Sequence, residues 1–254
     1  ALPIAFALAA AALAAQQAPP PATGYLLPPR TIVDILDAPP LPDIFVSPAR
    51  DGVALVERSS MPTIAELAQP MLRLAGMRVN PRTNGPHRPP GYRAITLKRL
   101  ADGSEIRVAP PANPNLGSIS FSPDGARLAF TQTRDTGVEL WIADVATGQA
   151  KAVTVAALNA AWGRPCEWLA DSASLLCQFV VSSRGPAPAP PAVPTGPNIQ
   201  EHEGGKLAPI RTYQDLLTSA HDETLFEHYF ASQIAIVEAA TGRRAPVGRP
   251  GLFE

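Results

Sequence analysis

The sequence predicts an all-β fold: an incomplete β-propeller of about three four-stranded blades with short helical insertions, preceded by a signal peptide. Three observations lead to this prediction. A hairpin pattern with a turn such as Pro-Asp-Gly recurs along the chain. An Ala-Thr-Gly turn occurs at 146–148 and again at 240–242, and the first 15 residues are apolar and uncharged.

The N-terminal residues 1–15, ALPIAFALAAAALAA, indicate an export signal. They are too short to span a bilayer, which takes about 20 apolar residues. The small residues at 12–14 and the polar QQAPPPATG that follows suit signal-peptidase cleavage. We therefore expect a periplasmic or secreted protein without stable membrane insertion after cleavage; a buried apolar helix is the alternative. Residues 16–40 are interpreted as an N-terminal extension or linker.

The clearest hairpin is ISFSPDGARLAF, at residues 119–130. Its alternation places Ile119 and Phe121 on the same buried face as Leu128 and Phe130, across the Pro-Asp-Gly turn. A second pair of strands, VELWIADVATGQAKAV, follows directly. Four antiparallel strands within about 40 residues are typical of one propeller blade.

Related copies flank this unit, at residues 44–56, 96–108, 167–177 and 232–247. They predict a partial β-propeller over 41–254, with blades at 41–112, 113–155 and 156–248 and the start of a further blade at 249–254. Stacked blades bury each other's apolar faces, and a closed ring typically needs four to eight of them. We therefore expect this sequence to be a fragment.

Two insertions interrupt the regular spacing of the strand hairpins, at residues 61–91 and 183–230. Long insertions on a propeller rim act as lids or partner surfaces; the alternative is that they have no function. The second ends in TYQDLLTSAHDETLFEHYF, which predicts one or two short helices. Thr212 is expected to cap the first helix, with Asp215 in its opening turn.

The chain has two cysteines, Cys166 and Cys177, which flank a hairpin with its turn at Asp171-Ser172. This register would place them opposite each other, and an oxidising compartment would then permit a disulfide. Two small buried side chains without a bond are the alternative.

Composition and motifs exclude several classes of function. The formal net charge is -1 and the 21 Lys and Arg residues are scattered, which argues against a nucleic-acid partner. The sequence has no nucleophile elbow, zinc helix or phosphate loop, so we assign no catalytic residue, metal ligand or cofactor site. Asp124 and Asp144 fit backbone-bonding roles at turns, and the acidic pair Asp222-Glu223 fits a solvated helix face.

Arg184 is the one candidate for contact with a substrate. It lies at the start of the second insertion and could hold a carboxylate through a bidentate contact. An ordinary surface arginine is the alternative.

Four segments resemble the glutamyl endopeptidase branch of the prolyl oligopeptidase family, which includes a chloroplast enzyme and bacterial relatives: residues 25–42, 66–84, 182–198 and 210–233. The resemblance implies an N-terminal propeller joined to a C-terminal α/β-hydrolase domain with a Ser-Asp-His triad, a domain that this chain lacks. It also implies cleavage of peptides after glutamate, with the propeller restricting access. The expected partners are therefore peptide substrates of the parent enzyme and that hydrolase domain.

The competing hypothesis is a non-enzymatic, TolB-like periplasmic binding propeller, which shares the Ser-Pro-Asp-Gly hairpins and the export signal. The insertions favour the peptidase, because segments 66–84 and 182–233 resemble that branch. A small-molecule propeller enzyme is a third possibility, but the sequence offers no metal or cofactor ligands for it.

Overall fold

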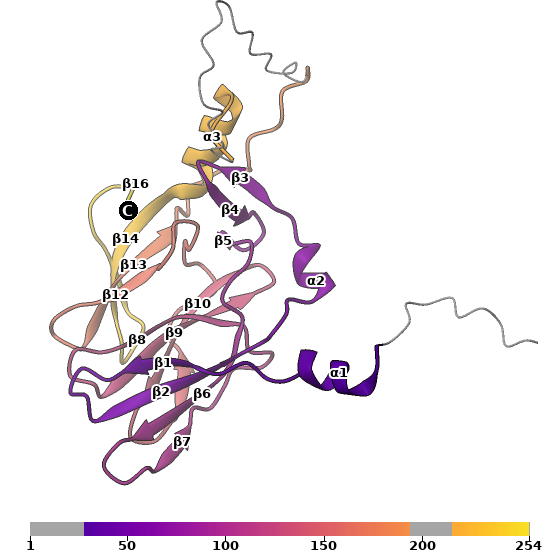
Figure 1. The fold of residues 1–254 in the computed structure, drawn as a ribbon. Helices are drawn as coiled ribbons and strands as arrows, with labels where there is room; N and C mark the ends of the chain where they lie inside the picture. Colours follow the sequence, from indigo (N-terminus) through magenta and orange to yellow (C-terminus); the bar gives the residue numbers. More distant parts are fainter. Residues whose placement is uncertain (1–27, 194–214, 254) are drawn as a thin grey trace, which may run out of the picture. The chain divides into compact units, whose positions relative to one another are not determined.

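The structure is a computed structural model that describes residues 28–193 and 215–253 (Figure 1). The chain divides into two compact units, 1–38 and 39–254. The predicted signal peptide and the predicted helix cap Thr212 lie outside the described residues. Within those residues, no helix has both the length and the apolar character needed to cross a bilayer.

In the described part of the first unit, residues 28–38, the structure has the helix α1 (Arg30–Leu36), which lies within the segment interpreted as a linker. Pro29 precedes it with a φ of -50°, which suits the start of a helix. Arg30 and Asp34, one turn apart, form an ion pair of 2.8 Å between Nε and Oδ1. This helix is not among the elements predicted from the sequence.

The described part of the second unit is mostly β and contains three sets of four antiparallel strands. Within each set, every strand pairs with the next strand of that set. The first set is β1 (Asp43–Val46), β2 (Gly52–Arg58), β6 (Tyr92–Arg99) and β7 (Glu105–Arg107). The second set is β8 (Leu116–Phe121), β9 (Arg127–Arg134), β10 (Gly137–Asp144) and β11 (Ala150–Ala152). The third set is β12 (Cys166–Trp168), β13 (Ser174–Val180), β14 (Ala231–Glu238) and β15 (Arg244–Pro246), with β16 (Gly251–Leu252) also pairing with β14.

The predicted hairpins form in the expected register. Phe121 pairs with Leu128 across the Pro-Asp-Gly turn, and Cys166 pairs with Cys177. One residue pair, Tyr92 with Leu116, joins the first and second sets into one sheet. Among the described strands no closed ring is formed, so the blade boundaries and the blade number of a complete ring stay predictions.

The second set is buried on both faces, because side chains alternate along a strand. Leu128 and Phe130 of β9 lie in a core with Val56 of the first set. Ala129, between them, lies in a second core with Leu175 of the third set. Neighbouring sets therefore stack face to face, and each covers apolar surface that the other could not bury alone.

The Ala-Thr-Gly turns contact the preceding set closely. Gly148 has a φ of 69°, and a Cβ there would lie 2.6 Å from Ile106 Cγ2 and 2.7 Å from the carbonyl oxygen of Arg107. A Cβ at Gly242 would overlap the carbonyl oxygen of Val153. Both turns thus require glycine for the backbone conformation and for the close approach.

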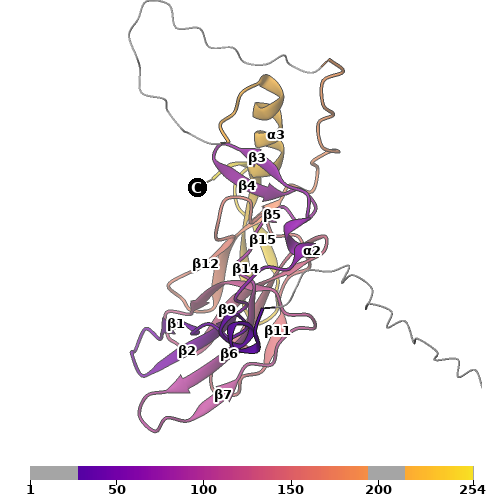
Figure 2. The ribbon, with the colours of Figure 1, turned by 45° about the vertical axis from the view of Figure 1, so that its right-hand side comes forward.

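The two insertions connect the second and third strands of their sets. The first holds α2 (Ile64–Leu67) and a small sheet of β3 (Leu72–Leu74), β4 (Met77–Asn80) and β5 (Gly85–Pro86); the second holds α3 (Ala220–Phe230). They pack together, so that α3 lies beside β3 and β4 (Figures 1 and 2). Their shared core includes Leu74 and Val79 from one insertion and Phe230 from the other.

The predicted opening turn of a helix at Asp215 is wrong. Asp215 has a φ of 61°, and its carboxylate accepts a hydrogen bond of 3.1 Å from Arg78 Nε of the first insertion. The helix begins later because Ser219 is its N-cap and forms a capping box with Asp222. Asp222 therefore caps the helix rather than lying free on a solvated face.

Candidate functional site

A cavity of about 330 Å³ lies where the first insertion meets the second strand set. Its walls come from three segments: the chain from the end of β2 through α2, the chain from β4 to β6, and the adjoining ends of β8 and β9. A second cavity, of about 280 Å³, lies at the hairpin turns at the other ends of these strands.

The first cavity has an excess of basic side chains. Its lining includes four arginines, one histidine and two carboxylates: Arg58, Arg88, Arg93, Arg134, His87, Glu66 and Asp135. A cleft lined mostly by one sign of charge attracts ligands of the opposite sign. The cavity therefore favours an anionic ligand.

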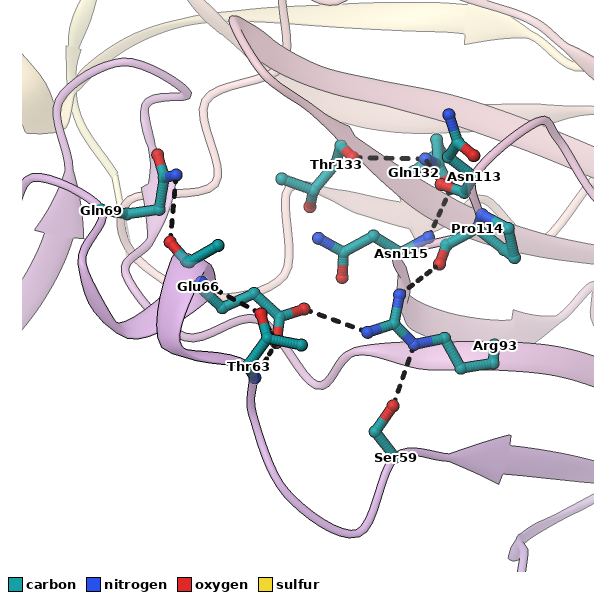
Figure 3. Close-up of polar contacts among 11 residues, drawn as sticks. Ser59, Thr63, Glu66, Gln69, Arg93, Asn113, Pro114, Asn115, Gln132 and Thr133 are labelled. Atoms are coloured by element: carbon teal, nitrogen blue, oxygen red, sulfur yellow. Dashed lines mark hydrogen bonds and ion pairs between the residues drawn. The ribbon is translucent and has the colours of Figure 1, made fainter. Parts of the chain in front are cut away.

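Arg93 fixes the floor of this cavity (Figure 3). Its Nη2 lies 3.0 Å from Glu66 Oε1, its Nε donates to Ser59 Oγ at 3.0 Å, and its Nη1 donates to the carbonyl oxygen of Pro114 at 3.0 Å. These contacts use all three nitrogens of the guanidinium group. They tie α2 and the chain before β8 to the start of β6.

Glu66 is held as a carboxylate by the capping box of α2. The backbone N–H of Thr63 donates to it at 2.7 Å, and this bond is the main reason why the pKa of Glu66 is lowered. The Thr63 hydroxyl and the nearby Arg93 lower the pKa of Glu66 further. Glu66 and Arg93 thus neutralise each other near neutral pH.

The other arginines differ in whether their guanidinium groups already have hydrogen-bond or ion-pair partners. Arg134 pairs with Glu139 at 3.1 Å and donates to the carbonyl oxygen of Ala112 at 2.9 Å. Arg58 lies 3.9 Å from Asp43, at the limit of an ion pair. Arg88 is exposed and has no hydrogen bond or ion pair within residues 28–193 and 215–253. Its charge is available to a ligand.

Asn115 lines the cavity and has a side-chain amide whose oxygen is unpartnered among the described residues. Its backbone is fixed, since its N–H donates to Gln132 Oε1 at 3.0 Å and its carbonyl accepts from the Thr133 N–H at 3.0 Å. Its Oδ1 is buried and has no hydrogen-bond partner in the described part of the chain. In Figure 3 the amide projects toward the side where Glu66 and Gln69 lie. A buried acceptor without a partner costs about 1–3 kcal/mol, and native proteins contain few such groups.

His87 has a structural role at the cavity wall. It is buried, and its Nε2 lies 3.0 Å from the carbonyl oxygen of Gln69. Because a carbonyl oxygen only accepts, Nε2 carries the proton and donates. Within the described ranges, no group of three or more His, Cys, Asp or Glu side chains could hold a metal ion. The arrangement can bind a ligand, and nothing in it resembles a nucleophile with its base.

Arg184, the candidate predicted from sequence, lies outside both cavities. Its Nη1 donates to Asn84 Oδ1 at 2.6 Å and to the carbonyl oxygen of His228 at 2.9 Å. Its guanidinium lies over the Tyr229 ring, and burial lowers the pKa of Arg184. Arg184 thus connects the two insertions, and its contact with a substrate stays a prediction.

A buried pair of asparagines completes this connection. Asn84 Nδ2 donates to Asn159 Oδ1 at 2.6 Å. Asn159 Nδ2 donates to the carbonyl oxygens of Tyr229 at 3.0 Å and Ala231 at 3.1 Å, and its Oδ1 accepts from the Ala161 N–H at 3.1 Å. Since Asn80 and Thr83 line the cavity just before Asn84, this network also holds one cavity wall in place.

The remaining predicted residues have structural positions. Cys166 and Cys177 lie opposite each other on β12 and β13, joined by a disulfide with an S–S distance of 2.10 Å; the formation of this bond in the cell stays a prediction. Asp124 accepts from Ser122 Oγ at 2.6 Å, and Asp144 accepts from the Thr147 hydroxyl at 2.8 Å, both within turns.

Sequence reasoning did not identify Arg88 or Asn115. Each is a polar residue within a Pro- and Asn-rich connection, with no motif around it. Their significance comes from the folding of the first insertion against β8 and β9, which no local pattern predicts.

Comparison with known proteins gives two relatives of substantial similarity. The chain is 34% identical over 244 residues to "Probable glutamyl endopeptidase, chloroplastic" of Oryza sativa subsp. japonica, and 35% identical over 245 residues to the protein of the same name from Arabidopsis thaliana. Each alignment covers 91% of this chain but only 26% and 25% of the relative. The chain therefore spans about a quarter of the length of these relatives. No family model matches it.

The similarity of this chain to solved structures is weaker. Pyrococcus horikoshii acylaminoacyl peptidase overlays on 83% of this chain and 25% of its own, with 16% identity and a TM-score of 0.41. TolB from Acinetobacter baumannii overlays on 85% of this chain and 44% of its own, with 15% identity and a TM-score of 0.32. Overlays as loose as these do not distinguish a peptidase from a binding protein.

Proposed function

We propose that this chain is part of a serine peptidase of the prolyl oligopeptidase family, in its glutamyl endopeptidase branch. In this proposal the three strand sets belong to an N-terminal β-propeller that gates the access of peptides. The catalytic triad is supplied by an α/β-hydrolase domain outside these 254 residues, and the chain by itself is inactive.

One observation carries the proposal: identity of 34–35% to two proteins named as glutamyl endopeptidases, over 91% of the chain. The part left out of each alignment is shorter than either insertion. Each alignment therefore extends at least partly into both insertions.

The chain's own residues supply binding and restriction of access. The insertions lie at the ends of the strands that they connect, and they are held together by Asn84, Asn159 and Arg184. Beneath the first insertion, the basic cavity can receive an anionic ligand. The acyl transfer itself would be the work of the triad in the hydrolase domain.

We also propose that the protein is exported to the periplasm or beyond. The apolar segment 1–15 supports this. The disulfide between Cys166 and Cys177 is a second support, because such bonds persist in oxidising compartments.

The proposal is tested with the full gene product and two short peptides that differ only in having Glu or Ala before the scissile bond. We expect cleavage after Glu, inhibition by a serine-reactive fluorophosphonate, and no cleavage of a stably folded protein that contains the same site. Binding of peptides without any hydrolysis would instead support a non-enzymatic binding propeller.

A further inference from the structure

We infer that the cavity beneath the first insertion binds a short extended peptide that carries a carboxylate. Asn115 would hold the peptide main chain, and Arg88 would hold the acidic group. This inference rests on the proposed function only for the source of the peptide, which would be a substrate entering the enzyme.

The charges in the cavity identify the acidic part of the ligand. Arg93 and Arg134 are already paired with Glu66 and Glu139, at 3.0 and 3.1 Å. Arg88 is a lining residue without a described partner. Arginine is suited to a carboxylate, because its planar group can donate two parallel hydrogen bonds.

The amide of Asn115 indicates that the part of the ligand beside the carboxylate is a peptide group. An amide side chain offers one acceptor and two donors, which is the complement of a peptide group with its N–H and C=O. Oδ1 of Asn115 is buried without a partner. The terminal torsion of an asparagine has broad minima, so rotation about it can turn Oδ1 toward a ligand.

The surroundings of these two residues are preorganised. The backbone of Asn115 is fixed by Gln132 and Thr133, and the opposite wall is fixed by the contacts of Arg93 with α2. A site fixed before binding loses less conformational entropy when the ligand arrives. The volume, about 330 Å³, is at the small end for ligand pockets, which suits a few residues of extended peptide.

The ligand is a peptide rather than a free inorganic anion because the two recognition groups differ in kind. A free anion could accept from Arg88 and from the amide N–H groups of Asn115, but it would bring no donor to the buried Oδ1. A neutral peptide could complement the amide of Asn115, but it would bring no carboxylate to Arg88. A peptide with an acidic group supplies both a donor for Oδ1 and a carboxylate for Arg88.

The test measures the binding of two labelled peptides, identical except for one Glu replaced by Gln, to the full gene product pretreated with a fluorophosphonate. Fluorescence anisotropy gives the affinities at low and high salt. The variants are Arg88→Gln, Asn115→Leu and, as the matched control, Arg249→Gln, an exposed arginine outside both cavities. Melting temperatures establish that each variant is folded.

We expect the Glu peptide to bind more tightly than the Gln peptide, with the difference declining in high salt. Arg88→Gln should weaken binding of the Glu peptide about tenfold and leave the Gln peptide within about twofold. Asn115→Leu should weaken both peptides about tenfold. Arg249→Gln should change neither.

Two results would overturn the inference: equal affinities for the two peptides, or affinities that neither Arg88→Gln nor Asn115→Leu changes. If the untreated protein still cleaves peptides in that case, the proposed function stands without this site. If the protein cleaves nothing but binds as described here, the site stands and the peptidase proposal fails.

Discussion

Replacing Gly148 by alanine tests whether the strand sets are stacked as closely as the structure has them. Gly148 lies in the Ala-Thr-Gly turn of the second set, and its carbonyl accepts a hydrogen bond of 2.8 Å from the N–H of Ala109 in the chain after the first set. Gly103 lies in the corresponding turn of the first set, with a nearly identical φ of 70°, but a Cβ there would meet nothing within 4 Å. The two glycines therefore differ only in their contact with a neighbouring set.

The expected losses of folding free energy in the two variants follow from this comparison. The left-handed conformation costs alanine about 1 kcal/mol, and this cost is common to Gly103→Ala and Gly148→Ala. At Gly148 the new Cβ would also lie 2.7 Å from the carbonyl oxygen of Arg107, which is backbone and cannot rotate away. Overpacking of this kind costs a further 1–3 kcal/mol or so. We expect a total of about 3 kcal/mol for Gly148→Ala and about 1 kcal/mol for Gly103→Ala.

Native-state hydrogen exchange measures these differences locally. In Gly148→Ala the amides of β10 and β11 should exchange about 100-fold faster, whereas in Gly103→Ala those of β6 and β7 should exchange only about 5-fold faster. Gly242→Ala should resemble Gly148→Ala, because its Cβ would overlap the backbone of Val153. Equal effects of Gly103→Ala and Gly148→Ala would refute the stacking of the first two sets.

Three further predictions concern the connection between the insertions, the cysteines and pH. Asn159→Ala removes four hydrogen bonds, so the free energy of opening of α3 should fall by about 3 kcal/mol; hydrogen exchange of α3 measures this, with the exposed Gln149→Ala as an unchanged control. Replacing both Cys166 and Cys177 by serine opens a loop with a sequence separation of 11. In urea denaturation this should cost about 3 kcal/mol, and a reductant should destabilise the parent protein but not the variant. Burial lowers the pKa of His228 from its ordinary 6.5, so the fold keeps its full stability above pH 6.5 and loses stability as the pH falls through the lowered pKa. A free energy of opening of α3, derived from hydrogen exchange, that is independent of pH from 7 to 5 would contradict this, as would a pH dependence that His228→Gln does not change.

The strand hairpins could be predicted from the sequence because their signals are local. Alternation of apolar residues around Pro-Asp-Gly or Ala-Thr-Gly fixes the turn and the register within about ten residues. Ile119 and Phe130 accordingly lie in the core to which the alternation assigned them.

The site could not be predicted in the same way. Asn115 becomes significant only because a segment about 50 residues earlier folds over it, and the insertion that does so has no repeat or motif. The expected first helix with Asp215 in its opening turn is also wrong, because Asp215 contacts Arg78, 137 residues away in sequence, instead of entering a helix. Long-range packing decided both outcomes.

The central claim is that this chain belongs to a serine peptidase whose reactive serine lies outside these 254 residues. The most direct measurement is to label the full gene product with a fluorophosphonate probe and to locate the modified residue by mass spectrometry. We predict a single labelled serine outside the chain described here, and loss of Glu-selective peptide cleavage when that serine is replaced by alanine. A full gene product that reacts with no probe and cleaves no peptide would contradict the account.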